Sequence, residues 1–203
     1  MSDLMHIWRK AFVAPVDSVG QSLSRFWRDL TAAATIEFIF LTPVILTMIG
    51  LVVAGGEGFE LNRKITMVVR TLADLASQQT NIGTSSSTYT YTQLLNAASL
   101  VIQPYDSSQL SLVLSEVSAN GAGTGVVKWS QGNTAAVANS MVLTAGATVS
   151  VPTNITAAGY LILGSARYNF QPLGIYLPIA AFPITDSLYL APRQGTSGVA
   201  CCS

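Results

Sequence analysis

The sequence predicts an α+β protein, in which one transmembrane helix extends into a longer helix and precedes a small antiparallel-sheet head domain. No residue from Phe38 to Gly56 is charged, and at about 1.5 Å per residue this run nearly spans a bilayer core. Helical apolar spacing continues to Gln79, and short runs of β character separated by turns follow. We therefore expect an amphipathic cytoplasmic segment over 1–30, the helix over 31–79 and an exported head over 80–203.

Composition supports a membrane protein. Half of the residues are hydrophobic and 10% are charged, against roughly 25% charged residues in an average soluble domain. The net charge is zero, so nothing suggests nucleic acid as a partner.

The two cysteines, Cys201 and Cys202, are adjacent, and no spacing in the chain resembles a metal site. Neighbouring cysteines can form a disulfide only through a strained ring. Pairing between chains and free thiols are therefore equally open alternatives.

Residues 1–30 have apolar side chains at helical spacing, with Arg9, Lys10, Arg25 and Arg28 between them. Basic and aromatic residues beside a membrane helix favour the bilayer interface. The alternative is a poorly ordered basic tail.

The membrane helix itself contains two residues of interest. Glu37 is an ionisable residue at the edge of the apolar run, and such a residue needs a partner, which makes it a candidate functional site. Pro43 removes the donor for the Ile39 carbonyl, so we expect a modest kink, with Thr42 and Thr47 satisfying the freed groups.

Beyond the apolar run, Glu57–Gln79 is predicted to continue the helix. Its apolar stripe, a packing surface for the head or a neighbouring subunit, consists of Leu61, Ile65, Val68, Leu72 and Leu75. Glu60 precedes Lys64 by four residues, the favourable order for a helical ion pair.

The head is predicted to begin with a linker over Thr80–Tyr91 and a helix over Gln93–Val101. The expected strands lie around Leu110–Ser115, Val127–Trp129, Val149–Val151, Tyr160–Phe170 and Ser187–Ala191. Four short features have structural interpretations. They are a hairpin turn at Gly121–Gly125, an accidental glycosylation sequon at Asn154–Thr156, a local Asp186–Arg193 ion pair and an exposed loop around Ile175–Ile184, which is also a candidate contact for a partner.

Catalysis is not expected. From residue 80 onward the acids are Asp106, Glu116 and Asp186, the bases are Lys128, Arg167 and Arg193, and there is no histidine. General acid–base and nucleophilic mechanisms need a histidine, paired carboxylates or a base beside a nucleophile. His6 is predicted to lie across the membrane from the head, so we expect no enzyme activity and no cofactor.

The orientation is predicted with the N-terminus in the cytoplasm. Basic residues before the helix favour an inner N-terminus only slightly, because Arg63, Lys64 and Arg70 follow it. The Ser/Thr-rich β character of the head favours export. A cleaved secretory signal ending near Ala54 is the alternative, although about 37 residues precede the apolar run.

The segment Ala33-Ala34-Thr35-Ile36-Glu37-Phe38, with Pro43 six positions after the glutamate, resembles the TadE-like family of tight-adherence (Tad, Flp-type) pilus assembly proteins. Gly56-Glu57-Gly58, Leu61 and Arg63 continue the resemblance, as does 70–75. The resemblance over 168–173 and 189–193 is weaker.

The resemblance implies a minor pilin, a pseudopilin or a membrane-anchored assembly component. Its partners would be the lipid bilayer, other pilins or assembly-platform proteins, and a prepilin peptidase that cuts between Ala32 and Ala33. The new ammonium group on Ala33 would lie one helical turn from Glu37, which would pair between subunits. Alanine stands where processed members have glycine, so an uncut scaffold is the alternative. An anchored adhesion module unrelated to pili is the alternative from another class.

Overall fold

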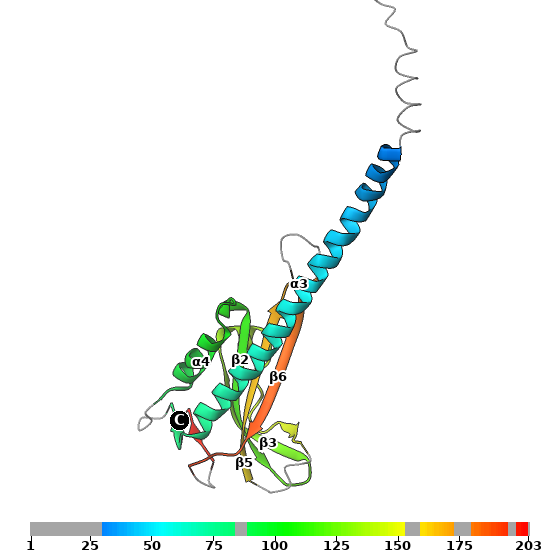
Figure 1. The fold of residues 1–203 in the computed structure, drawn as a ribbon. Coiled ribbons are helices and arrows are strands. Elements are labelled where there is room, and N and C mark those ends of the chain that lie inside the picture. Colours follow the sequence, from blue (N-terminus) through cyan, green and yellow to red (C-terminus); the bar gives the residue numbers. More distant parts are fainter. Residues whose placement is uncertain (1–29, 84–88, 153–158, 173–179, 195–197, 203) are drawn as a thin grey trace, which may run out of the picture. The chain divides into compact units, whose positions relative to one another are not determined.

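The computed structural model describes residues 30–83, 89–152, 159–172, 180–194 and 198–202, apart from the side chains of 30–33. The chain divides into two compact units, residues 1–53 and 54–203. A single helix, α3 (Leu30–Ser77), contributes residues to both units (Figure 1). Its C-terminal part therefore belongs to the same unit as the head.

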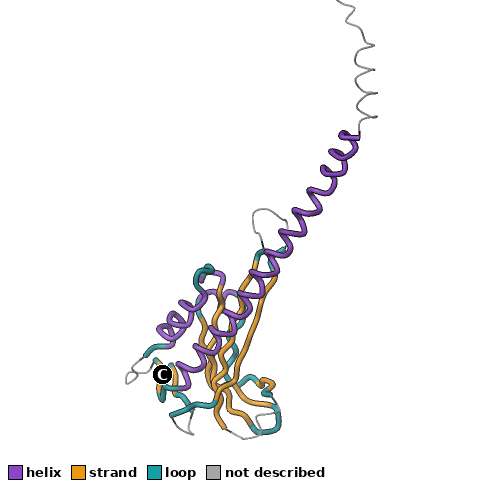
Figure 2. The backbone as a smooth tube through the Cα atoms, in the orientation of Figure 1, coloured by secondary structure: helices purple, strands orange, loops and turns teal. Residues whose placement is uncertain are grey.

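The head is built on a curled five-stranded antiparallel sheet (Figure 2). The strands, in spatial order, are β4 (Thr148–Ser150), β3 (Thr124–Gly132), β2 (Leu110–Ala119), β5 (Gly159–Phe170) and β6 (Phe182–Leu190). Each neighbouring pair is antiparallel, and β2 and β5 form the longest ladder at the centre. The predicted α+β fold class is confirmed.

Each strand predicted from the sequence overlaps a strand of the sheet, but β2 and β3 extend beyond the expected bounds. The last strand, β6, begins at Phe182, before the expected start. Phe182–Ile184, placed in a contact loop from the sequence, therefore belongs to the sheet, whereas 173–179 lie outside the described residues. The turn expected at Gly121–Gly125 lies between β2 and β3 but is shorter, because Thr124 and Gly125 already belong to β3. The Asn120 side chain accepts hydrogen bonds there from the backbone N–H groups of Ala122 and Thr124.

Short helices connect the strands. They are α4 (Tyr91–Ser99), the 3₁₀ turns η1 (Leu100–Ile102) and η2 (Ser107–Gln109), and α5 (Thr134–Ala138). The predicted helix over 93–101 thus corresponds to α4 with η1. A capping box starts α4: the Thr90 hydroxyl accepts from the Gln93 N–H, and the Gln93 side chain accepts from the Thr90 N–H.

The predicted linker over 80–91 is partly wrong. Asn81–Ile82 forms β1, which pairs in parallel with β7 (Ala200–Cys201). Ile82 is fully buried, so the chain that leaves α3 enters the core at once. A two-residue strand carries no alternating pattern, so the sequence contained no periodic signal for it.

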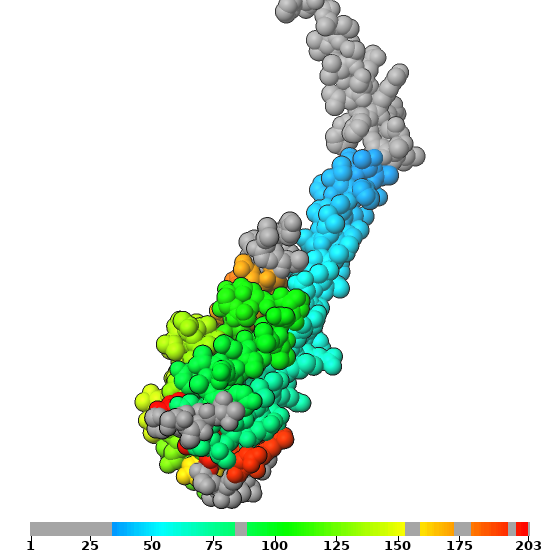
Figure 3. All heavy atoms as spheres, turned by 90° about the vertical axis from the view of Figure 1, so that its left-hand side faces the viewer, coloured from blue at the N-terminus to red at the C-terminus, as the bar shows by residue number. Residues whose placement is uncertain are grey.

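The core lies between α3 and one face of the sheet. The stripe residues Leu61, Ile65, Val68 and Leu72 are fully buried, and they join α4, β2 and β5 in one cluster. Figure 3 shows the green segment that contains α4 packed along the cyan helix. Burial of each such side chain stabilises the fold by about 1.5–3 kcal/mol. The stripe is therefore the packing surface for the head, as predicted.

A second, smaller cluster covers the other face of the sheet. Its buried members are Val117, Ala119, Val127, Val151, Leu161 and Leu163. Successive residues of a strand point to opposite faces, so β2 and β5 contribute to both clusters. This arrangement explains why β2 is buried on both faces over nearly its whole length.

The helix and the sheet approach closely at Gly164. A Cβ atom at this position would lie 3.2 Å from the Val69 carbonyl oxygen and 3.4 Å from the Ala73 Cβ. The absence of a side chain on this residue of β5 therefore lets the backbone of α3 lie directly on the sheet.

Candidate functional site

The apolar part of α3 in the first unit presents its side chains outward. Large hydrophobic residues of 38–53 are exposed, with Phe38 at 68%, Phe40 at 72% and Val52 at 75%. A folded chain in water does not leave a continuous surface of this kind uncovered. By length and composition α3 is a candidate membrane-spanning helix near the N-terminus, and a signal sequence fits the same criteria.

Glu37 is exposed on this part of the helix. Among the residues that the structure describes, no cation forms an ion pair with it. A carboxylate in an apolar environment is unfavourable without a partner. Any cation that pairs with Glu37 therefore lies outside the described residues.

The backbone at Ala32 and Ala33 is helical, and α3 continues without a break through Pro43. The hydroxyl of Thr42 donates to the Phe38 carbonyl at 2.7 Å, and that of Thr47 to the Val44 carbonyl at 2.8 Å. Neither hydroxyl bonds to the Ile39 carbonyl, which loses its donor at Pro43. The prediction that these threonines satisfy the freed carbonyl is therefore wrong.

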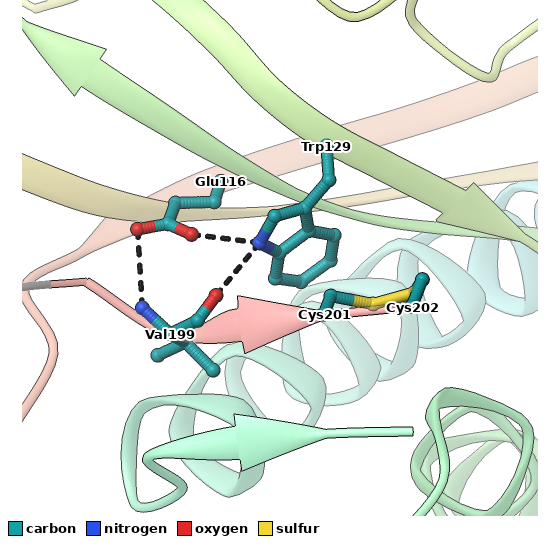
Figure 4. Close-up of a disulfide and its surroundings, with 5 residues drawn as sticks. All are labelled: Glu116, Trp129, Val199, Cys201 and Cys202. Carbon is teal, nitrogen blue, oxygen red and sulfur yellow. Dashed lines mark hydrogen bonds between the residues drawn. A yellow bond between two sulfur atoms is a disulfide. The ribbon is translucent and has the colours of Figure 1, made fainter. Parts of the chain in front are cut away.

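A second cluster of polar groups lies inside the head, where the sequence analysis predicted no site. Glu116 on β2 is only 4% exposed, and its two oxygens have different donors. Oε1 accepts from the Val199 N–H at 3.1 Å, and Oε2 accepts from Trp129 Nε1 at 2.7 Å. Trp129 Nε1 also donates to the Val199 carbonyl at 2.7 Å (Figure 4). The carboxylate thus connects two strands to the C-terminal segment.

The environment of Glu116 changes its acidity. Burial raises the pKa of the carboxyl above its ordinary value, because desolvation penalises the charged form. The hydrogen bonds from Val199 and Trp129, and then the charge of Lys128, oppose this effect and lower the pKa. The net direction is upward, as expected when desolvation is the largest contribution.

A cavity of about 370 Å³ adjoins this cluster. It is lined by Thr80, Asn81, Glu116, Trp129, Tyr160, Gln194, Gly198, Val199 and Ala200. Both Glu116 oxygens already accept hydrogen bonds within the head. The arrangement therefore fits a structural connection between β2, β3 and the C-terminal strand, rather than an acid or base aimed at a substrate.

Cys201 and Cys202 lie beside this cluster, and the structure joins their sulfur atoms in a disulfide between neighbouring residues (Figure 4). The sequence left three alternatives open: a disulfide between the two neighbouring cysteines, pairing between chains, and free thiols. The structure has the first of these. Within the described residues, no group of three or more His, Cys, Asp or Glu side chains lies close enough to hold a metal ion.

The remaining candidates have mixed outcomes. The predicted Asp186–Arg193 ion pair is wrong: Arg193 pairs with Asp74 on α3 at 2.5 Å, and an Asp186 oxygen accepts from the Ser187 N–H. The predicted Glu60–Lys64 pair is present at 3.8 Å. The sequon at 154–156 and the histidine at position 6 lie outside the described residues.

Comparison with known proteins adds no relative. No protein-family model matches the chain, and no match is found among curated proteins or solved structures.

Proposed function

We propose that this chain is a non-enzymatic minor pilin, pseudopilin or membrane-anchored assembly component of a Tad-type pilus. The observation that carries the proposal is the exposed apolar stretch of α3 that bears Glu37 and continues into the helix supporting a β head. This is a pilin-like architecture: one part of the helix is available for a bilayer or for other helices, and the rest is committed to the head. The sequence resemblance over 32–75 supports the same function.

In this proposal Glu37 acts between subunits. Its carboxylate has no ion-pair partner among the described residues, and a neighbouring chain would supply a cation within the apolar environment. A prepilin peptidase cut between Ala32 and Ala33 would create such a cation one helical turn away. The N-terminus would face the cytoplasm, and the head would lie outside the inner membrane.

The test replaces the native chain in its host by a Glu37→Ala variant. We expect filament assembly to fall by at least about tenfold, which corresponds to ~1.4 kcal/mol of lost interaction, while the variant still resists alkaline extraction from membranes. Sheared filaments are quantified by immunoblotting. Glu37→Asp, which retains a carboxylate, is the matched control and should preserve part of the assembly.

Assembly at the wild-type level in Glu37→Ala would contradict the proposal. It would place Glu37 at the membrane interface without a partner and favour an anchored adhesion module. Such a module would tolerate the change but lose its function when the head is replaced.

A further inference from the structure

Two exposed aromatic side chains of the second unit lie near each other, one on α3 and one on the sheet. Phe59 on α3 is 80% exposed, and Phe182, the first residue of β6, is 46% exposed. Phe170 connects them, because a Cβ atom added at Gly58 would lie 3.4 Å from Phe170 Cε1, and the ring centres of Phe170 and Phe182 are 5.5 Å apart. The Phe182 ring therefore lies level with the turn of α3 that carries Phe59.

The two aromatic side chains are on the same side of α3. Phe59 and Arg70 are eleven residues apart, which places them within about 20° of each other around the helix. Arg70 lines a groove together with Leu188 and Leu190 of β6, so this side of the helix borders β6. Phe59 and Phe182 therefore form one surface, which we call the aromatic patch.

The carboxylates of the same helical turn lie elsewhere around α3. By helical geometry Glu57 is about 160° and Glu60 about 100° from Phe59. Burial raises the pKa of the Tyr105 hydroxyl, and the negative charges of Glu60 and then Glu57 raise it further, which is consistent with both carboxylates lying toward the segment after α4. The side of this turn that carries the aromatic patch is therefore apolar.

The aromatic patch begins where the uncharged run of α3 ends. The run ends at Gly56, and Phe59 follows three residues later, about 4.5 Å along the helix axis. The headgroup layer on each side of a hydrocarbon core is roughly 5–8 Å thick. Phenylalanine side chains of membrane-bound surfaces commonly enter the boundary between headgroups and acyl chains. With the run across a bilayer, the aromatic patch would lie at this depth.

Arg63 adds a positive charge on the same side of α3. It follows Phe59 by four residues, so it lies one helical turn further from the uncharged run. It is exposed, and within the described part of the chain it forms no ion pair. An arginine side chain can lie along apolar surface while its guanidinium group binds a phosphate.

Resting on the proposed function, which places α3 across a bilayer, we propose that the head itself binds the lipid interface. Phe59 and Phe182 enter the headgroup layer, and the Arg63 guanidinium contacts a lipid phosphate. Lipid is the partner that the position favours, because it already surrounds α3 up to the residue at which the aromatic patch begins. The contact attaches the head to the membrane at a second point besides the helix, and it restricts how the head can tilt.

The test uses the full-length chain in phospholipid nanodiscs of phosphatidylcholine and phosphatidylglycerol. Trifluoromethylphenylalanine is incorporated at one position at a time, in place of Phe59, Phe182 or Val126. Val126 on β3 is the matched control, because it is 42% exposed and lies toward the opposite end of the sheet from Phe182. Broadening of the fluorine NMR signal is measured with a nitroxide-labelled lipid and, separately, with a water-soluble nickel chelate.

We expect the lipid nitroxide to broaden the signals at Phe59 and Phe182 at least about three times as strongly as the signal at Val126, and the nickel chelate to show the reverse order. Arg63→Glu should lower the lipid broadening at Phe182 by about twofold or more, because a carboxylate is repelled by lipid phosphates. Arg70→Glu, on the same side of α3 but about 10 Å further from the run, is the control for charge reversal and should leave it unchanged.

Lipid broadening at Phe182 no stronger than at Val126 would overturn the inference even if Phe59 were broadened, because only the helix would then contact lipid. Protection of Phe182 from both reagents would also overturn it and assign the aromatic patch to a protein contact. An unchanged signal in Arg63→Glu would contradict the role of that arginine. In each case the proposed function would stand if Glu37→Ala still abolished filament assembly, whereas a chain that failed to insert into the bilayer would contradict both.

Discussion

Glu116 shows how one residue can connect distant parts of the chain. Its carboxylate contacts Trp129 on the neighbouring strand and Val199 near the C-terminus. Since burial raises its pKa, the folded head holds the carboxyl proton to a higher pH than the unfolded chain does. The contribution of this group to stability is therefore largest below the unfolded pKa of about 4.3, and it is lost as the pH rises through the folded value.

We predict that Glu116→Gln removes this pH dependence. As the pH falls from 7 toward 4, the free energy of unfolding of the wild type should rise relative to the variant, by at most ~1.4 kcal/mol per pH unit. The variant should also be less stable by roughly 1–3 kcal/mol, because the amide NH₂ group would face one of the two donors. Urea unfolding in detergent, followed by tryptophan fluorescence, measures both effects. Parallel stability curves at all pH values would contradict the prediction.

At the residue scale, the sequence was least informative about such long-range pairs. Glu116 looked like one of three scattered acids, because the residues that bind it lie far away in the chain. The predicted Asp186–Arg193 pair failed for the same reason. Proximity in sequence suggested a partner, whereas the fold brings Asp74 of α3 to Arg193.

At the scale of elements, the sequence was more informative. The stripe from Leu61 to Leu72 repeats at helical spacing, and apolar residues of β2 and β5 recur with a period of two, so the spacing of the apolar residues indicated both kinds of element. The short β1 and β7 have no such pattern, since two residues cannot show a period. They are defined by their pairing alone.

Gly164 allows a sharp test of the contact between α3 and β5. Gly164→Val should destabilise the head by about 1–3 kcal/mol, because the added atoms would press against the backbone of α3 at Val69. Thermal or urea unfolding of the full chain in detergent measures the change.

Gly159 on the same strand provides the matched control, because a Cβ atom there would meet nothing within 4 Å. Gly159→Val should change the stability by less than about 0.5 kcal/mol. Equal effects of the two substitutions would show that β5 tolerates valine poorly for reasons unrelated to the helix.

At the scale of the whole molecule, the prediction concerns the N-terminus of the mature chain. The full-length protein is expressed with its cognate peptidase, extracted from membranes and weighed intact by mass spectrometry. We expect a chain that begins at Ala33, which would place a free ammonium group one helical turn before Glu37.

Two other masses would have definite meanings. A chain that begins near Met1 would favour an uncut scaffold with residues 1–30 as a cytoplasmic segment. A chain that begins at Gly55 would contradict both forms of the proposal and leave a secreted protein without its apolar helix.

The parallel pairing of β1 with β7 has a consequence for biogenesis. β1 follows directly after α3, whereas its partner is synthesised more than a hundred residues later. Closing a loop of this length is entropically costly and slow, so this contact forms late. In the orientation proposed above, the head would complete its fold only after residue 201 had crossed the membrane. Until β7 arrives, Ile82 would lack the strand that pairs with it. A partly translocated chain would therefore differ from a finished one at β1, the segment that follows α3.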